Sequence, residues 1–171
     1  QTEAMTMGDR IAVLKYGELQ QCASPIDCYQ NPKNKFVASF IGSPIMNFFD
    51  VTYEPETGII SGPSGFTFEV SADKQEQLSN YDGPLTLGVR PEGFTIARSE
   101  SDAHITTTVE LLEPHGDVTY LSTEYAGTEV TVAVHNHPET SDIPELQEGK
   151  PVHLKISKSM FCLFDPDTGE S

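Results

Sequence analysis

The chain has 171 residues, of which 37% are hydrophobic, 26 acidic and 10 basic, giving a formal net charge of −16 at pH 7. A surface this negative repels phosphate backbones and anionic headgroups, so it argues against nucleic acid or a membrane surface as partner. The length suits one domain with an appendage or two small domains, and no stretch approaches the ~18 consecutive apolar residues that span a bilayer.

The acidic residues are spread along the chain rather than gathered in a tail, which argues against a disordered acidic segment. Two explanations of the charge stay open. One is a salt-loving source, in which dissolved salt screens the self-repulsion of the surface. The other is an ordinary acidic cytosolic protein.

The first residue is Gln1 rather than Met, and neither a basic nor an apolar leader follows it. This predicts a part of a longer protein and no signal peptide. Cys22, Cys28 and Cys162 are an odd number of cysteines without C-x-x-C spacing, which disfavours a disulfide framework and a zinc site. We expect buried or half-buried free thiols in a reducing cytosol.

The first predicted element is a tight β-hairpin. An apolar run over residues 10–15 is followed by a turn at Tyr16-Gly17-Glu18 and a second strand over residues 19–22. Gly17 is expected in the left-handed conformation that such turns require.

Two short helices are predicted next. Ser24 is a suitable N-cap with Pro25 at the first helical position, and Ile26 and Tyr29 are expected on one face before the helix stops at Asn31-Pro32. The second helix has apolar residues at helical spacing and is expected to end at Gly42. Its apolar residues are Phe36, Val37, Phe40 and Ile41.

From Pro44 onward the pattern changes to short strands separated by Gly- and Pro-rich turns, with one helix over residues 72–78. The expected strands cover residues 47–53, 58–61, 66–70, 85–89, 94–97, 105–112, 118–125, 129–134, 152–156 and 162–164. The clearest hairpin joins residues 118–125 to 129–134 across Ala126-Gly127, because apolar and polar residues alternate along its second strand. Many short strands with such turns favour a mainly β fold, a small Greek-key barrel of the OB type.

Motifs of catalysis are missing from the sequence. It holds no G-x-x-x-x-G-K-[ST] phosphate loop, since its one Gly-Lys pair, Gly149-Lys150, is followed by Pro151. It also holds no G-x-S-x-G and no H-E-x-x-H. We therefore predict no enzyme activity, no catalytic or metal-binding residues and no cofactor for this chain alone.

Two polar stretches contain residue types that bind metals. His135-Asn136-His137 offers two imidazoles, but Pro138-Glu139 follows and no cysteine lies near, so a polar loop is favoured. The stretch from Asp165 to Gly169 could open a calcium loop, but no glutamate follows at the required spacing, so a turn is favoured.

Arg90 is one of only three arginines and lies in Gly88-Val89-Arg90-Pro91-Glu92. The rigid Pro91 fixes the loop so that Arg90 and Glu92 can reach neighbouring backbone or each other. A structural ion pair is favoured over a ligand contact.

At residues 3–6, 8–14 and 17–21 the start resembles the stretch after the switch histidine of ABC ATPases. With the residues that follow, the sequence resembles a known family, the ATP-binding subunits of carbohydrate ABC importers of the maltose and glycerol-phosphate type. The resemblance continues through Ser24-Pro25, Tyr29, Pro32, Asn34 and residues 36–38 to the expected domain junction. That junction is Phe40, Ile41, Gly42, Ser43, Pro44, Met46 and Asn47. The motif Gly88, Val89, Arg90, Pro91 and Glu92 resembles the signature of the transport-associated OB (TOBE) regulatory domain.

The resemblance implies two parts. Residues 1–43 would be the end of an ABC ATPase domain, a hairpin and helices left from its α/β fold, and residues 44–171 a TOBE/OB regulatory domain. It further implies that ATP and Mg belong to the parent protein and that the regulatory domains pair as a homodimer. The parent would bind membrane permease subunits at the cytoplasmic face of the plasma membrane, and in some members a regulatory protein. Cys22 departs from the family pattern, which usually has Gly there, and this puts the local turn in doubt.

Two other function classes remain open. Related domains of oxyanion importers bind molybdate-like anions, so an oxyanion-binding OB module is the alternative, although such a site needs clustered basic residues or backbone amides. A nucleic-acid-binding OB-fold needs a basic groove with aromatic platforms, and the charge opposes it.

Overall fold

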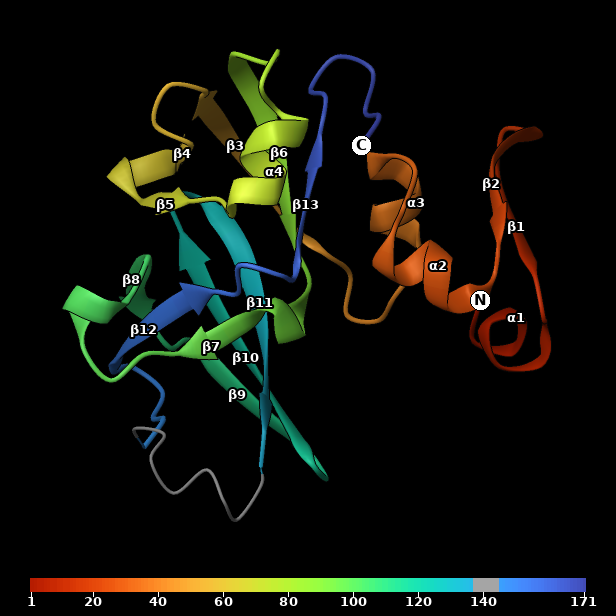
Figure 1. The fold of residues 1–171 in the computed structure, drawn as a ribbon. Helices are drawn as coiled ribbons and strands as arrows, with labels where there is room; N and C mark the ends of the chain where they lie inside the picture. Colours follow the sequence, from red (N-terminus) through yellow and green to blue (C-terminus); the bar gives the residue numbers. More distant parts are fainter. Residues whose placement is uncertain (137–144) are drawn as a thin grey trace.

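The computed structural model describes residues 1–136 and 145–171. We call residues 1–43 the N-terminal segment and residues 44–171 the β-body; the two lie side by side, with helices of the segment facing the body (Figure 1). Among the described residues, the paired strands are antiparallel, both in the hairpin of the segment and in the three sheets of the body.

The N-terminal segment consists of a helix, a hairpin and two further helices. Its elements are α1 (Thr2–Met7), β1 (Ile11–Lys15), β2 (Glu18–Ala23), α2 (Pro25–Gln30) and α3 (Lys35–Phe40). The hairpin prediction is confirmed, with positive φ at Tyr16 (49°) and Gly17 (81°). Cys22, despite the doubt about its turn, lies inside β2 opposite Ala12.

Side-chain caps start α2 and α3. The Ser24 hydroxyl accepts a hydrogen bond from the Asp27 amide, and the Asn34 side chain accepts one from the Val37 amide. Caps of this kind satisfy amides that the first turn leaves without partners. Ile26 and Tyr29 are three positions apart in α2 and so share a face as expected, although Ile26 is 66% exposed and Cys28 is the residue of α2 that is buried.

The β-body contains eleven strands among the described residues, and its sheets have the orders β11-β10-β9, β7-β12-β8 and β13-β6-β3-β4-β5. The strands are β3 (Asn47–Glu54), β4 (Ile59–Ser61), β5 (Thr67–Glu69), β6 (Gly83–Val89), β7 (Phe94–Ile96), β8 (Ile105–Thr108), β9 (Leu111–His115), β10 (Val118–Tyr125), β11 (Thr128–His135), β12 (Pro151–Ile156) and β13 (Phe161–Phe164). Between them lie α4 (Ala72–Gln77) and the 3-10 turns η1 (Pro63–Gly65), η2 (Pro91–Gly93) and η3 (Glu100–Asp102). The predicted helix over residues 72–78 is confirmed.

One predicted strand is wrong. Residues 105–112 form two strands, since β8 pairs with β12 whereas β9 pairs with β10. The chain changes sheets at Val109, whose amide donates to Lys150, and Glu110, whose amide donates to Ser122. The break therefore depends on partners far along the chain.

The hairpin of β10 and β11 is confirmed, with eight paired positions across a turn at Ala126-Gly127. Along β11 every second side chain is buried, starting with Val130, and the residues between them are more exposed. This alternation places one face of the hairpin against the core.

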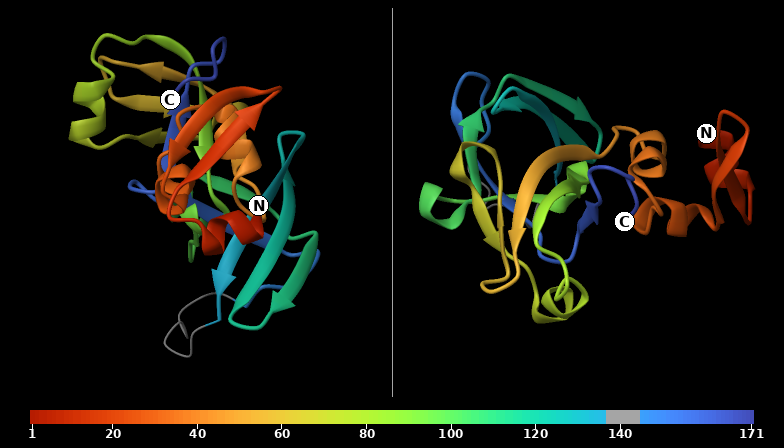
Figure 2. Two further views of the ribbon diagram at one scale, coloured as in Figure 1. Left: turned by 90° about the vertical axis from the view of Figure 1, so that its right-hand side faces the viewer. Right: turned by 90° about the horizontal axis from the view of Figure 1, so that it is seen from above.

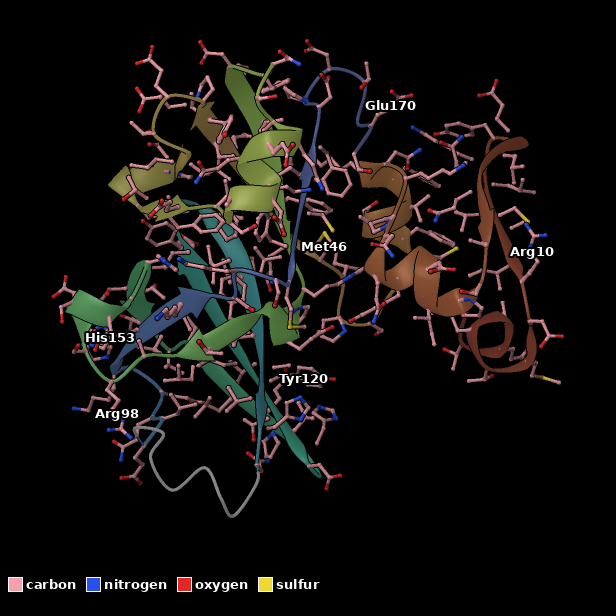
Figure 3. All side chains as sticks on the ribbon, in the orientation of Figure 1. Arg10, Met46, Arg98, Tyr120, His153 and Glu170 are labelled. Atoms are coloured by element: carbon pink, nitrogen blue, oxygen red, sulfur yellow. The ribbon has the colours of Figure 1, made fainter. Side chains whose placement is uncertain are left out.

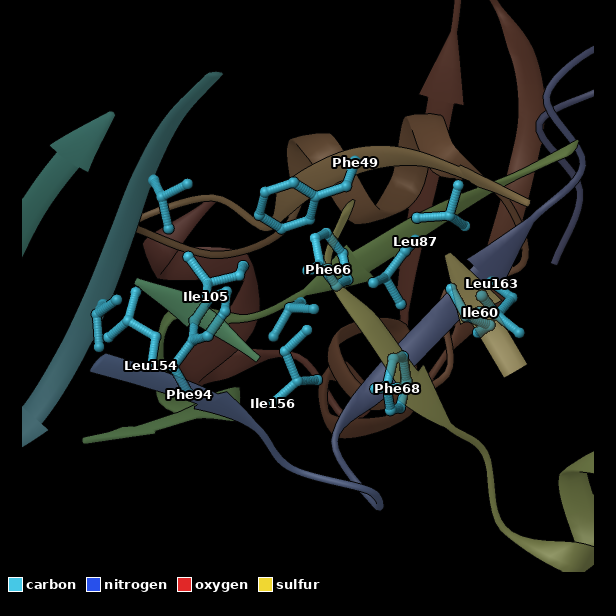
Figure 4. Close-up of a cluster of buried hydrophobic side chains, with 14 of the residues drawn as sticks. Phe49, Ile60, Phe66, Phe68, Leu87, Phe94, Ile105, Leu154, Ile156 and Leu163 are labelled. Carbon is cyan, nitrogen blue, oxygen red and sulfur yellow. The ribbon is translucent and has the colours of Figure 1, made fainter. Parts of the chain in front are cut away.

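An apolar core lies between the three sheets. Phe49, Leu87, Phe94, Ile105 and Leu154 come from different strands and meet there (Figure 4). Seen from above, the strands curve round this core and the N-terminal segment projects from one side (Figure 2). The predicted mainly β class is confirmed. In the part of the chain that the structure describes, no helix has the length and apolar character needed to cross a membrane.

Candidate functional site

The site is the contact between the N-terminal segment and the β-body, and Arg90 is its centre. Arg90 follows β6 and is only 6% exposed. Its Nη1 donates to the carbonyl oxygens of Ala38, at 3.1 Å, and Ile41, while Nη2 donates to that of Tyr29 at 3.0 Å. These carbonyls lie in the last turns of α2 and α3, where carbonyl groups lack helical partners and carry partial negative charge. We call this set of contacts the Arg90 joint.

Tyr29 is held from two sides at the joint. The guanidinium carbon of Arg90 lies 4.2 Å from the centre of its ring, a cation–π contact. The Tyr29 hydroxyl donates to the carboxylate of Glu92. Burial, together with the neighbouring Glu92, raises the pKa of Tyr29, so the hydroxyl stays a donor at neutral pH. Burial also lowers the pKa of Arg90.

The expected ion pair is replaced by these contacts. Arg90 binds backbone carbonyls and the Tyr29 ring, and Glu92 accepts from Tyr29. The planar guanidinium can donate to several carbonyl oxygens at once from one position. A carboxylate bound to it would have occupied the same N–H donors. The expected reach to neighbouring backbone is confirmed.

Gly42 connects the two parts and needs to be a glycine. Its φ is +113°, and a Cβ there would lie 2.9 Å from Nη1 of Arg90 and 3.1 Å from Cε2 of Tyr29. A side chain at this position would therefore strain the backbone and push the joint apart. The peptide bond between Ser43 and Pro44 is cis.

Of the other expected junction residues, Phe40 and Ile41 have opposite environments. Ile41 is 2% exposed and packs in a small cluster with Val13, Cys28 and Val37. Phe40 is half exposed, and its ring stacks on that of Phe36.

Met46 and Gly88 fill the space between the helices and β6. Met46 packs with Ala38 of α3 and Phe164 of β13, and Figure 3 shows it between the helices and the strands. A Cβ at Gly88 would lie 2.3 Å from the Met46 sulfur and 3.0 Å from the Phe164 ring. The motif glycine thus makes room for the junction methionine.

Asn47 connects three strands through its side chain. Its amide nitrogen donates to Val89 of β6 at 3.1 Å and to Thr131 of β11 at 2.8 Å, and its oxygen accepts from the Thr131 amide at 2.8 Å. The remaining motif residues, Val89 and Pro91, are buried beside it and beside Arg90 respectively.

The motif and the junction, 40 or more residues apart in sequence, therefore meet at one place. From the sequence alone, the C-terminal residues were not identified as part of this site. Lys35 donates its amide to Gly169 at 2.7 Å, and Ser171 donates its amide to Lys33 at 3.0 Å. No pattern in the last residues marks this pairing.

The other predicted features lie elsewhere. Asp165 accepts from the amides of Asp167 and Thr168, the expected turn, and these bonds lower the pKa of its carboxyl group. His135 ends β11, while His137 lies outside the described residues. Within the described ranges, no group of three His, Cys, Asp or Glu side chains is placed to hold a metal ion.

The three cysteines are free thiols. Cys28 is buried and Cys162 half-buried, as expected, but Cys22 is exposed because its side chain lies on the outer face of β2.

Comparisons with known proteins match this architecture. Residues 42–94 match the family model of the MalK OB fold domain, and residues 87–164 match that of the TOBE domain. The xylose/arabinose import ATP-binding protein XacK of Haloferax volcanii is 37% identical over 180 residues, covering 100% of this chain and 43% of the relative. The maltose/maltodextrin import ATP-binding protein MalK of Vibrio vulnificus is 38% identical over 161 residues, covering 90% of this chain and 42% of the relative.

The chain thus spans less than half the length of the curated relatives it matches. Among solved structures, the cytoplasmic molybdate-binding protein ModG with molybdate bound aligns with a TM-score of 0.54 at 18% identity. That alignment covers 70% of this chain and 96% of ModG. At this identity the likeness concerns the fold alone.

Proposed function

Because the chain belongs to the C-terminal MalK OB-fold and TOBE region of carbohydrate ABC importer ATP-binding subunits, we propose that it joins two such subunits as a dimer through its β-body. The parent protein, in this proposal, couples ATP hydrolysis to carbohydrate import. ATP and Mg bind in the parent's other region, since the matched residues form the regulatory part. The chain itself acts in regulation and assembly rather than in catalysis.

The family match carries this proposal, and the Arg90 joint supports its regulatory part. We assign residues 1–43 to the end of the ATPase domain and residues 44–171 to the regulatory domain. Arg90 fastens the ends of α2 and α3 to the β-body through three carbonyls, so movement of the segment is transmitted to the body. A fixed connection of this kind is what a domain needs in order to keep two moving ATPase domains together.

The partners follow from the same assignment. The parent binds permease subunits in the membrane and so lies at the cytoplasmic face of the plasma membrane as a peripheral subunit. A homodimer forms through the regulatory domain, and a regulatory protein is a further partner in some members. Relatives named for xylose/arabinose and maltose/maltodextrin import support a sugar as the transported substrate.

An oxyanion-binding OB module has less support. The fold likeness to ModG concerns the fold alone, and the buried Arg90 already uses three donor contacts on backbone carbonyls. The formal charge of −16 further opposes capture of an anion.

Hydrogen–deuterium exchange of the full chain, at protein concentrations above and below dimer dissociation, tests the proposal. We expect the additional protection at high concentration in peptides of the β-body. Protection confined to β1 and β2 would contradict it, because the dimer would then form through the exposed hairpin edge.

A further inference from the structure

A cavity of about 360 Å³ lies beside the Arg90 joint. Three stretches line it: residues 29–31 of the N-terminal segment, Arg90 and Glu92 after β6, and residues 159–162 before and within β13. Met46, labelled in Figure 3 between the helices and the strands, completes the lining. Its volume is within the range of about 300 to 1,000 Å³ usual for small-molecule sites, which often lie between domains.

Polar groups line one part of the cavity. Arg90 contributes part of its guanidinium-bearing side chain. Its Nε is buried and has no hydrogen-bond partner among the described residues. Glu92 contributes a carboxylate, Asn31 an amide and Ser159 a hydroxyl. Donors and acceptors therefore both occur within one small space.

Apolar side chains line the rest. Met46, Met160 and Phe161 contribute thioether and aromatic surfaces. An aromatic ring and polarisable sulfur pack well against C–H groups. A ligand that fits must therefore combine an apolar face with hydrogen-bonding edges.

Charge decides between ligand classes. The Arg90 charge is opposed by Glu92 and by three carbonyl dipoles, so an anion entering the cavity would lack a dedicated positive partner. An organic cation would have to lie near the guanidinium. We propose that this cavity binds a neutral polyhydroxylated molecule of monosaccharide size, whose hydroxyls both donate and accept and whose ring carbons present C–H groups.

The proposal does not rest on dimerisation, because every lining residue belongs to one chain. A ligand bound there contacts α2 and the β-body together, so its binding stabilises the Arg90 joint. Binding and joint stability are then linked by mass action.

Amide chemical shifts of the full chain provide the test. D-xylose and D-glucose are titrated to concentrations well above millimolar, with sodium sulfate and glycine as an anionic and a zwitterionic comparison. We expect saturable shifts with a sugar, centred on residues 29–31 and 159–162. No saturable shift there with either sugar would overturn the proposal, as would stronger binding of sulfate or glycine at the same amides.

Variants locate the site. Asn31→Ala removes an amide from the cavity, and Asn80→Ala removes one from an exposed position away from it. We expect at least a threefold weaker sugar affinity for Asn31→Ala and no change for Asn80→Ala. Ser159→Trp, which places a large side chain at the cavity, should abolish the shifts while the spectrum elsewhere stays that of the folded chain. Equal sugar affinity in Ser159→Trp and in the unsubstituted chain would overturn the proposal.

Discussion

Arg90 donates a hydrogen bond to the carbonyl oxygen of Ile41, the residue that caps α3, although the two are 49 positions apart. The contact connects the motif after β6 to the end of the N-terminal segment. Because Ala38 and Tyr29 accept from the same guanidinium, one buried side chain holds both helices on the β-body.

Replacing this guanidinium should loosen the segment. In Arg90→Lys the charge remains, but a single ammonium cannot reach three carbonyls in the same plane or stack as well on Tyr29. Leaving buried carbonyls without donors costs about 1–3 kcal/mol. We expect a loss of that size in the free energy of unfolding, measured by urea denaturation, and faster proteolysis within residues 1–43.

Arg10→Lys is the matched control, since Arg10 makes one exposed hydrogen bond, to Cys22. Its effect should stay within about 0.5 kcal/mol. Equal effects of the two substitutions would show that the Arg90 joint adds nothing specific.

The strands and the hairpins follow from local patterns, so the sequence predicts most of them. Alternation at Val130 and the turn at Tyr16-Gly17 act over a few residues. The helix α1 escapes prediction because none of its residues is buried, which leaves no apolar periodicity. The break between β8 and β9 at Val109 also escapes prediction, because hydrogen bonds to Lys150 and Ser122, which are distant in sequence, determine its position.

The candidate site is predictable only in part for a related reason. The sequence singles out Arg90 through its rarity and through Pro91. Its acceptors, however, are backbone carbonyls, and every residue has one, so no residue type identifies them. Asn47 is likewise singled out as a junction residue, whereas its pairing with Thr131 arises only from the fold.

Asn47→Ala should destabilise the β-body. The substitution removes three hydrogen bonds to backbone groups of Val89 and Thr131. We expect a loss of about 2–4 kcal/mol in urea denaturation, from several unmade bonds of about 1 kcal/mol each. Asn47→Asp should lose more at neutral pH, because a carboxylate would then face two carbonyl oxygens. An Asn47→Asp variant as stable as the unsubstituted chain would contradict the hydrogen bonds assigned to the Asn47 side chain.

Because of His104, the free energy of unfolding should fall as the pH drops below about 6.5. Its Nδ1 accepts from the Ile156 amide at 2.9 Å, which requires the neutral ring. Burial, and then Lys155 and Lys158, lower the pKa of His104 below its ordinary 6.5. At pH values between the pKa of His104 in the folded chain and that in the unfolded chain, the unfolded chain binds more protons. The stabilisation by neutral His104 is therefore present above the pKa of the unfolded chain and is lost on acidification.

The measurement compares the parent chain with His104→Gln, which keeps an acceptor but does not titrate, in urea denaturation at pH 8 and at pH 5. The parent chain should lose more stability between the two pH values than the variant. His115→Gln, at an exposed position, should behave as the parent chain does. A parent chain and His104→Gln with parallel pH profiles would rule out the assigned role.

Salt should stabilise the chain if its acidity reflects a salt-loving source. The Debye length falls from about 30 Å at 0.01 M to about 3 Å at 1 M, so repulsion within a surface of net charge −16 is nearly removed. We expect Tm to rise steadily from low to multimolar sodium chloride. Equal Tm values at both ends would favour the ordinary acidic protein instead.

The molar mass of the full chain in solution, by light scattering after size exclusion in low and multimolar salt, tests the dimer most directly. We predict twice the 18.7 kDa of one chain in multimolar salt. The same mass is predicted for Leu14→Lys/Leu19→Lys, which places charges on the hairpin at side chains that are 57% and 61% exposed. A monomer in both salts, or a dimer that this double variant dissociates, would contradict a β-body that joins two subunits.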